Sequence, residues 1–223
     1  DIIVRDPRIE PAHPLGDRDI RRRQAVVHQD RGHAAAGDQA GQLVTYSLTV
    51  NTPAGWHIIA PGNGVSTGPD GMARWATPSA VDEISVAGGP LTPYTATASS
   101  APVAVEAQVY LREPDPALAT RYLDATSRYL RMYNELIGAY PYEKFALVEN
   151  FWETGYGMPS YTLLGPQIIR FPFILTSSYP HEILHNWWGN SVYVDYLTGN
   201  WAEGLTAYLA DHLMKEIEGS GAE

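Results

Sequence analysis

The chain has 223 residues, enough for one large domain or two small ones, and a hydrophobic fraction of 44%, which is ordinary for a globular protein. Its formal net charge of −10 argues against a nucleic-acid partner, because phosphates are bound by clustered Lys and Arg. The absence of cysteine excludes disulfides, thiolate metal sites and cysteine nucleophiles. No segment has the roughly 18 apolar residues of a membrane-spanning helix, so we expect no transmembrane segment.

Residues 1–40 differ in composition from the rest of the chain. They are rich in Arg and Asp, include the run Arg21–Arg23 and lack periodic apolar positions. We predict an irregular N-terminal segment here. The alternative is a nucleic-acid-binding arm, which the acidic residues interspersed among the basic ones disfavour.

Residues 41–112 are expected to form a β-rich domain. Short runs of β-branched and apolar residues alternate there with Gly and Pro, which is typical of strands joined by turns. The runs predict strands at 43–50, 82–87 and 103–111.

The pattern becomes helical after Pro114. Residues 116–138 place apolar side chains at helical spacing along one stripe, which predicts a core-facing helix ended by Gly138 and Pro141. Two short apolar runs, 145–148 and 161–164, predict buried strands. The chain as a whole therefore predicts an α+β fold with a second domain over residues 113–223.

The segment from His181 to His185 reads His-Glu-Ile-Leu-His. Two histidines four positions apart lie on one face of a helix, so their imidazoles can converge on one metal ion. Glu182 follows the first histidine, and its carboxylate can reach a metal-bound water without binding the metal. The alternative is a helix that carries two surface histidines.

A second helix is predicted to begin after Asn200, whose side chain can cap it. Glu203 lies in its first turn, and with His181 and His185 it would leave a fourth zinc position open to water, as in catalytic sites. The alternative role of Glu203 is to complete a capping box with Asn200. The apolar face of this helix is expected to consist of Leu205, Tyr208, Leu209 and Leu213.

These motifs resemble a known family. His181–Asn190, His-Glu-Ile-Leu-His-Asn-Trp-Trp-Gly-Asn, is similar to the zinc helix of the aminopeptidase N family of gluzincins (peptidase family M-one). Trp201–Gly204 resembles that family's third-ligand helix, although the loop before Glu203 is one residue shorter than usual. The resemblance covers about residues 41–223, most strongly from 141 onward. It implies a Zn²⁺-dependent peptidase acting on a peptide or protein, with the first part of a thermolysin-like domain over residues 113–223.

One segment departs from the family pattern. Family members that remove N-terminal residues carry a Gly-x-Met-Glu-Asn strand, whose Glu binds the free amine of the substrate. Here the strand reads Gly-Tyr-Gly-Met-Pro-Ser, so that Gly157 and Met158 match and Pro159 replaces the Glu. The resemblance implies substrate contacts at Gly157 and Met158 but does not predict aminopeptidase specificity. Glu149 or Glu153 could replace the missing Glu, and no spacing favours either.

An edge strand over residues 157–164 is expected to hold an extended substrate through main-chain hydrogen bonds. Pro159 has no N–H and would interrupt this ladder at one point. The family's catalytic Tyr lies well downstream of the third ligand, in a region that would follow Glu223. We therefore expect the chain to be a fragment, and the oxyanion-stabilising residue stays unidentified.

The sequence thus predicts hydrolysis of peptide bonds by a metal-activated water, with Glu182 as general base and zinc held by His181, His185 and Glu203. The first alternative is a non-catalytic zinc-binding or scaffolding protein on the same fold, which the missing amine-binding Glu favours and the intact Glu182 disfavours. The second is a chance motif in a domain that binds no metal. Exopeptidase or endopeptidase action, oligomeric state and compartment stay open.

Overall fold

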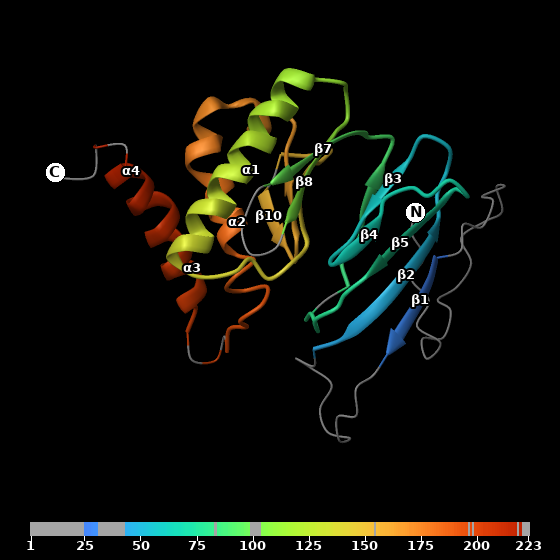
Figure 1. Cartoon of the computed structure of the whole chain (residues 1–223), viewed down its shortest axis with the longest axis horizontal. Coiled ribbons are helices and arrows are strands. Elements are labelled where there is room, and N and C mark those ends of the chain that lie inside the picture. The colour runs from blue at the N-terminus through green and yellow to red at the C-terminus, as the bar shows by residue number, and fades with distance from the viewer. Residues whose placement is uncertain are drawn as a thin grey trace.

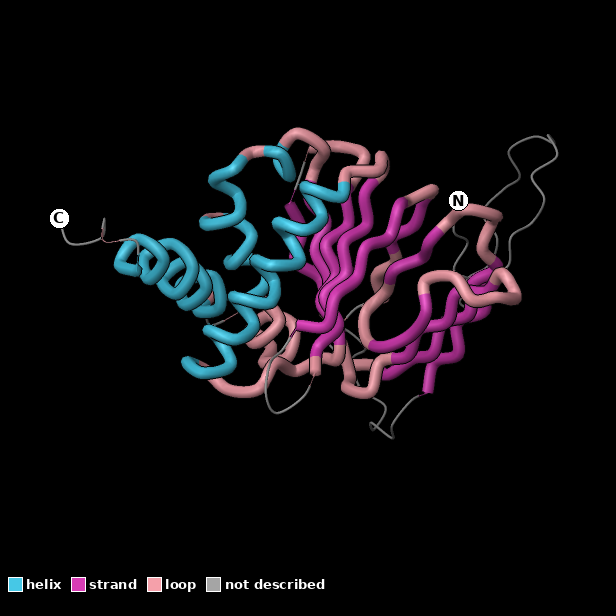
Figure 2. Tube along the Cα trace, turned by 45° about the horizontal axis from the view of Figure 1, so that its top comes forward, coloured by secondary structure: helices cyan, strands magenta, loops and turns pink. Residues whose placement is uncertain are grey.

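The computed structural model describes residues 25–30, 43–82, 84–98, 104–153, 155–195, 197, 199–217 and 219. The elements form three layers (Figure 1): an N-terminal sheet, a central five-stranded sheet and a group of helices. Figure 2 shows the helices gathered on one side of the central sheet and the N-terminal strands on the other. The central sheet is therefore covered on both faces.

The N-terminal layer contains two small antiparallel sheets. Four strands lie in the order β1-β2-β5-β4, and β3 pairs with β6. Buried and exposed residues alternate along β2, so that Tyr46, Leu48 and Val50 face a core that also contains Trp75. The strands are β1 (Ala25–Asp30), β2 (Thr45–Asn51), β3 (His57–Ile59), β4 (Asn63–Val65), β5 (Met72–Ala76) and β6 (Ala87–Gly89).

The central sheet has the order β10-β11-β9-β8-β7. Its inner strands β8 and β9 run parallel and are buried along almost their whole length, as expected for strands covered on both faces. β10 pairs only with β11 in this order and is an edge strand. The strands are β7 (Thr92–Ala98), β8 (Val105–Leu111), β9 (Lys144–Glu149), β10 (Gly155–Met158) and β11 (Tyr161–Leu164).

The long helix α1 (Pro116–Leu136) covers the central sheet. Asp115 caps it by accepting the Leu118 N–H at 2.9 Å, and its buried stripe packs against β7 and β8. None of the helices within the described residues is long and apolar enough to cross a bilayer. The shorter helical segments are η1 (Ile168–Arg170), η2 (Pro172–Thr176), α2 (Ser178–Leu184), α3 (Trp201–Ala207), the π-helical turn η3 (Tyr208–His212) and α4 (Leu213–Ile217).

Most predicted elements are present. The runs 43–50, 103–111, 145–148 and 161–164 correspond to β2, β8, β9 and β11, and the predicted long helix corresponds to α1. The strand predicted at 82–87 is wrong, because Ala87 is the one described residue of this range that lies in a strand. Ile84 and Val86 instead pack against the N-terminal core from an irregular segment, which accounts for their apolar character.

The β-rich stretch predicted over residues 41–112 is divided between the two layers. β7 and β8 belong to the central sheet, where β8 pairs with β9 across the α1 crossover. A strand's own residues do not specify its partner, so the pattern could not show this grouping. We therefore propose a boundary near residue 90 instead of 112. Residues 25–30 form β1, which corrects the irregular segment predicted over 1–40; residues 1–24 and 31–40 lie outside the described residues.

Candidate metal centre

Helix α2 carries the two motif histidines and is anchored on α1. Tyr179 on α2 is fully buried, and its hydroxyl lies 2.5 Å from the Thr126 hydroxyl of α1. The Tyr179 ring also meets the ring of Tyr122 edge to face. One turn beyond the helix, the Trp187 indole N–H donates to the Gly138 carbonyl at 3.0 Å. These contacts fix the position from which the histidines project.

Helix α3 carries the predicted third ligand. Asn200 caps it as expected, accepting the Glu203 N–H through its side chain at 3.5 Å. The predicted apolar face is wrong at Leu205 and Tyr208, which are 42% and 58% exposed. The π-helical turn η3, which follows α3, changes the spacing of the buried residues. Most of the side chains that α3, η3 and α4 bury are small, so α3 and η3 pack closely on α2. Its buried residues are Ala202, Thr206, Ala210 and Met214.

The structure brings His181, His185 and Glu203 together. The two Nε2 atoms lie 3.1 Å apart, and the Glu203 carboxylate oxygens lie 3.3 Å from His181 Nε2 and 3.4 Å from His185 Nε2. A tetrahedral zinc with bonds of about 2.0–2.1 Å separates its ligands by about 3.3 Å. Within the part of the chain that the structure describes, this trio is the one group of acidic and histidine side chains that could share a metal ion. The donor atoms therefore fit zinc in kind and in spacing.

The protonation of His185 also suits metal binding. Burial, followed by the nearby His181, lowers the pKa of His185, which favours the neutral ring that a metal requires. Its Nδ1 lies 3.3 Å from the Trp188 carbonyl. A proton on Nδ1 would be donated to that carbonyl and would leave the Nε2 lone pair directed at Glu203 and His181.

Glu182 lies beside the trio without belonging to it. Burial, and then the negative charge of Glu203, raise the pKa of Glu182 to about 7. A cation held by Glu203 would lower this pKa again, since a nearby positive charge favours the carboxylate. A Cβ placed on Gly157 of β10 would meet the Glu182 Oε2 atom at 2.6 Å. The bare backbone of Gly157 therefore allows β10 to approach the carboxylate.

A pocket of about 370 Å³ opens over these groups. It joins three parts of the chain, because Asp82 comes from the N-terminal layer while the other lining residues come from β10 and from the helices and their connections. Met158, in contrast, is partly buried against the apolar cluster between the two sheets and does not line the pocket. The lining residues are Asp82, Gly155, Tyr156, Gly157, His181, Glu182, His185, Gly189, Asn190 and Glu203.

Neither glutamate considered as a replacement amine ligand lines this pocket. The Glu149 carboxylate is buried and accepts the Arg112 N–H at 2.8 Å and the Arg170 guanidinium at 2.6 Å. The Glu153 carboxylate accepts the N–H groups of Gln167 and Ile168, with distances between 2.9 and 3.3 Å. Both carboxylates therefore stabilise the segment around η1, and neither lies in the pocket.

The edge strand predicted over residues 157–164 is instead a hairpin, so Pro159 lies outside the edge strand β10. β10 ends at Met158, and Pro159 and Ser160 form the two-residue turn to β11. Ser160 has a φ of 66°, and proline followed by a residue with positive φ is the arrangement of a type II turn. β10 therefore keeps regular pairing from Gly155 to Met158.

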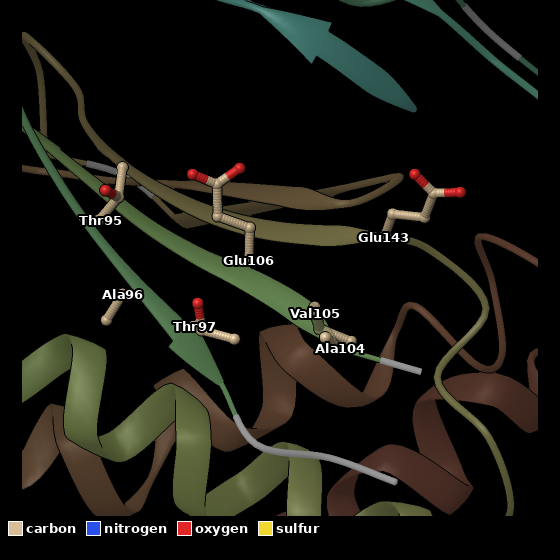
Figure 3. A pocket seen from close by; sticks show the side chains of 7 residues that line it. All are labelled: Thr95, Ala96, Thr97, Ala104, Val105, Glu106 and Glu143. Atoms are coloured by element: carbon tan, nitrogen blue, oxygen red, sulfur yellow. The ribbon is translucent and has the colours of Figure 1, made fainter. Parts of the chain in front are cut away.

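A second, larger hollow of about 730 Å³ lies along β7, β8 and the start of β9 (Figure 3). The carboxylates of Glu106 and Glu143 point away from the helices in this view. The lining contains no histidine, so it does not offer the donor set found at the pocket. The lining residues are Thr95, Ala96, Thr97, Ala104, Val105, Glu106 and Glu143.

No protein-family profile and no curated protein sequence matches this chain. Solved structures do match. The M1 zinc metallopeptidase from Deinococcus radiodurans superposes with a TM-score of 0.64 at 20% identity, over 82% of this chain and 43% of that one. Its E323A mutant bound to a Tyr-Ser-Ala substrate gives 0.65 at 21% identity, over the same shares. Native yeast LTA4 hydrolase gives 0.63 at 19% identity, over 78% of this chain and 28% of that one.

The chain spans less than half the length of each of these enzymes. At such identities the match speaks for the fold, and it agrees with the resemblance found in the zinc-helix and third-ligand motifs. The chain has the α+β fold of part of the M1 zinc metallopeptidases and of LTA4 hydrolase.

Proposed function

We propose that this chain is part of a zinc-dependent peptidase. In this proposal His181, His185 and Glu203 hold the zinc, Glu182 is the general base, and the helices and central sheet form the first part of a thermolysin-like domain. The observation that supports it most directly is the spacing of the three donor atoms, which is that of tetrahedral zinc ligands, with Glu182 next to them in an open pocket.

In this proposal the side chains of the pocket have separate roles in catalysis. A zinc ion held by the trio would polarise a substrate carbonyl and acidify a water molecule. Glu182, which does not belong to the ligand trio, would accept the proton of the attacking water and return it to the leaving nitrogen. Its carboxylate extends from α2 toward Gly157 of the edge strand β10, which supports this role if substrate lies along that edge.

The edge strand β10 would align the substrate. Its outer main-chain groups are available within the central sheet, and Gly155 to Gly157 line the pocket. An extended peptide added to this edge would run past Glu182. Substrate contact at Gly157 and Met158 is therefore proposed through the main chain of β10, because the Met158 side chain is partly buried against the apolar cluster between the two sheets.

The alternative is a zinc-binding protein without turnover. Pro159 occupies the position of the family's amine-binding Glu, and Glu149 and Glu153 are engaged elsewhere. These observations argue most strongly against aminopeptidase activity. An enzyme that cleaves within a peptide needs no carboxylate to bind a free amine, so these observations do not argue against endopeptidase activity.

The test measures zinc content and peptide turnover in the wild type, His185→Ala and Glu182→Gln. We expect one zinc per chain in the wild type and in Glu182→Gln, and its loss in His185→Ala. Turnover should fall by about 10²–10⁴-fold in Glu182→Gln, the usual contribution of a general base. Zinc without wild-type turnover would favour the non-catalytic alternative. A folded wild type that takes up no zinc would refute both.

A further inference from the structure

Lys144, the first residue of β9, is buried without a carboxylate partner. It is 3% exposed, and among the described residues no carboxylate lies within ion-pair distance of it. Its ammonium lies over two aromatic rings, 4.9 Å from the centre of Trp75 and 5.6 Å from that of Tyr161. Burial lowers the pKa of Lys144 to about 7, while the charge of the adjacent Glu106 acts in the opposite direction.

Within the part of the chain that the structure describes, the Lys144 ammonium donates two hydrogen bonds, both to Ser160. The Nζ atom donates to the Ser160 hydroxyl at 2.7 Å and to the Ser160 carbonyl at 3.1 Å. Ser160 is fully buried in the turn between β10 and β11. Its hydroxyl also accepts the N–H of Gly62 in the N-terminal layer at 3.0 Å. Ser160 thus joins the N-terminal layer, β9 and the tip of the β10–β11 hairpin.

The same serine reaches the helix that carries the histidines. The Ser160 N–H donates to the side-chain oxygen of Asn186 at 2.7 Å, and Asn186 is fully buried. The side-chain amide of Asn186 donates in turn to the carbonyls of Glu182 at 3.3 Å and Ile183 at 3.0 Å. An unbroken set of hydrogen bonds therefore runs from Gly62 to the backbone of Glu182.

Two locally unfavourable residues meet in this network. A buried lysine without an ionic partner is costly, and an apolar side chain of the same length would fill the space at less cost. Ser160 has a φ of 66°, a conformation that Gly or Asn adopts more readily. Residues that lower the stability of the fold are expected to cluster at functional sites, where their role outweighs their cost.

We propose that Lys144 and Ser160 are positioning residues that set the separation between β10 and Glu182 while the N-terminal layer is docked at Gly62. The separation matters because Gly157 and the Glu182 carboxylate are so close that no side chain fits between them. The network fixes both sides of this gap, the hairpin through the Ser160 main chain and α2 through Asn186. The link to catalysis rests on the proposed function and deepens it.

The test compares Lys144→Met and Ser160→Gly with Lys215→Met, which alters the only other lysine of the chain, an exposed residue. In the zinc-free proteins, amide hydrogen exchange at 155–164 and 183–188 should become about 10-fold faster in the first two variants, the equivalent of one buried hydrogen bond. Urea should show global stability no lower than in the wild type for Lys144→Met, and a loss of about 1–3 kcal/mol for Ser160→Gly, whose hydroxyl accepts two buried hydrogen bonds. With zinc, kcat should fall by about 10-fold or more while KM changes by less than about 3-fold.

Unchanged exchange in the two segments, or faster exchange spread evenly over the protein, would overturn the proposal. If Lys144→Met does not fold, Ser160→Gly decides alone, because glycine accepts the turn conformation and removes only the hydroxyl. If the wild type shows no turnover, the proposed function fails and hydrogen exchange still decides whether the network positions β10 and α2.

Discussion

The close approach of β10 to Glu182 makes Gly157→Ala the sharpest test of the site. The added Cβ would lie 2.6 Å from Glu182 Oε2, against about 3.4 Å for an ordinary contact, so the carboxylate must move by about 0.8 Å. The φ of Gly157 is not in the positive region, so alanine strains no backbone there. A misplacement of about 1 Å at a catalytic group can lower the rate by about 10²-fold. We expect a loss of that size in kcat.

Gly155→Ala is the matched control on the same strand. A Cβ at Gly155 would meet Leu164 Cδ2 at 3.6 Å and Glu182 Oε1 at 3.8 Å, which are ordinary contacts. The assay compares kcat for peptide hydrolysis, zinc content and urea unfolding of both variants with those of the wild type. Zinc content should stay at one per chain in both, because the ligand atoms are not displaced directly. The end of the flexible Glu182 side chain can yield, so neither variant should lose more than about 1 kcal/mol of stability.

Equal kcat values in Gly157→Ala and Gly155→Ala would refute the reasoning, since only the first displaces the carboxylate. Loss of zinc from Gly157→Ala would also contradict it. In that case the strand would support the ligands, and the effect on kcat would say nothing about Glu182.

Three further predictions follow from other groups. Removing zinc with a chelator should lower the free energy of unfolding by about 2.7 kcal/mol relative to protein at a free zinc concentration 100 times the dissociation constant, measured by urea titration. Glu203→Gln should weaken zinc binding in a competition assay while the Asn200 cap keeps α3 helical, and wild-type affinity would remove Glu203 from the ligand set. Burial lowers the pKa of Lys144 to about 7 in the folded chain, against 10.5 for an unperturbed lysine, so the unfolded state binds the extra proton between these values. The free energy of unfolding should therefore rise with pH from 7 to 9.5, by about 3 kcal/mol over that interval. Lys144→Met should flatten this rise, and an equal slope in that variant would assign it to another group.

The proximity of the candidate ligands was largely predictable because two of them, with Glu182, are local in the sequence. His181, Glu182 and His185 lie on one helical turn, so their spacing alone predicts convergence. Glu203 needed a second helix to be recognised, and Asn200 marked its start. The distances among these side chains agree with what a shared metal requires.

The parts that could not be predicted depend on contacts between distant segments. The pairing of β8 with β9 spans the whole of α1, and nothing in either strand specifies it. The buried face of α3 was misassigned because helical periodicity assumes 3.6 residues per turn, and the π-helical turn at Tyr208–His212 breaks that assumption. Asp82 reaches the pocket from another layer, and no local pattern marks it.

Lys144 shows most clearly where local patterns stop being informative. In the sequence it is one polar residue before an apolar run, which is the usual start of a strand leaving the solvent. Trp75 from the N-terminal layer covers it together with Tyr161 of β11, and the turn at Ser160, to which Gly62 donates, gives it acceptors. The N-terminal layer therefore does more than cover the central sheet. It contributes to the low-dielectric environment in which the lysine, the hairpin and α2 are held together, so removing that layer should disturb the geometry around Glu182 even though it supplies none of the three candidate metal ligands.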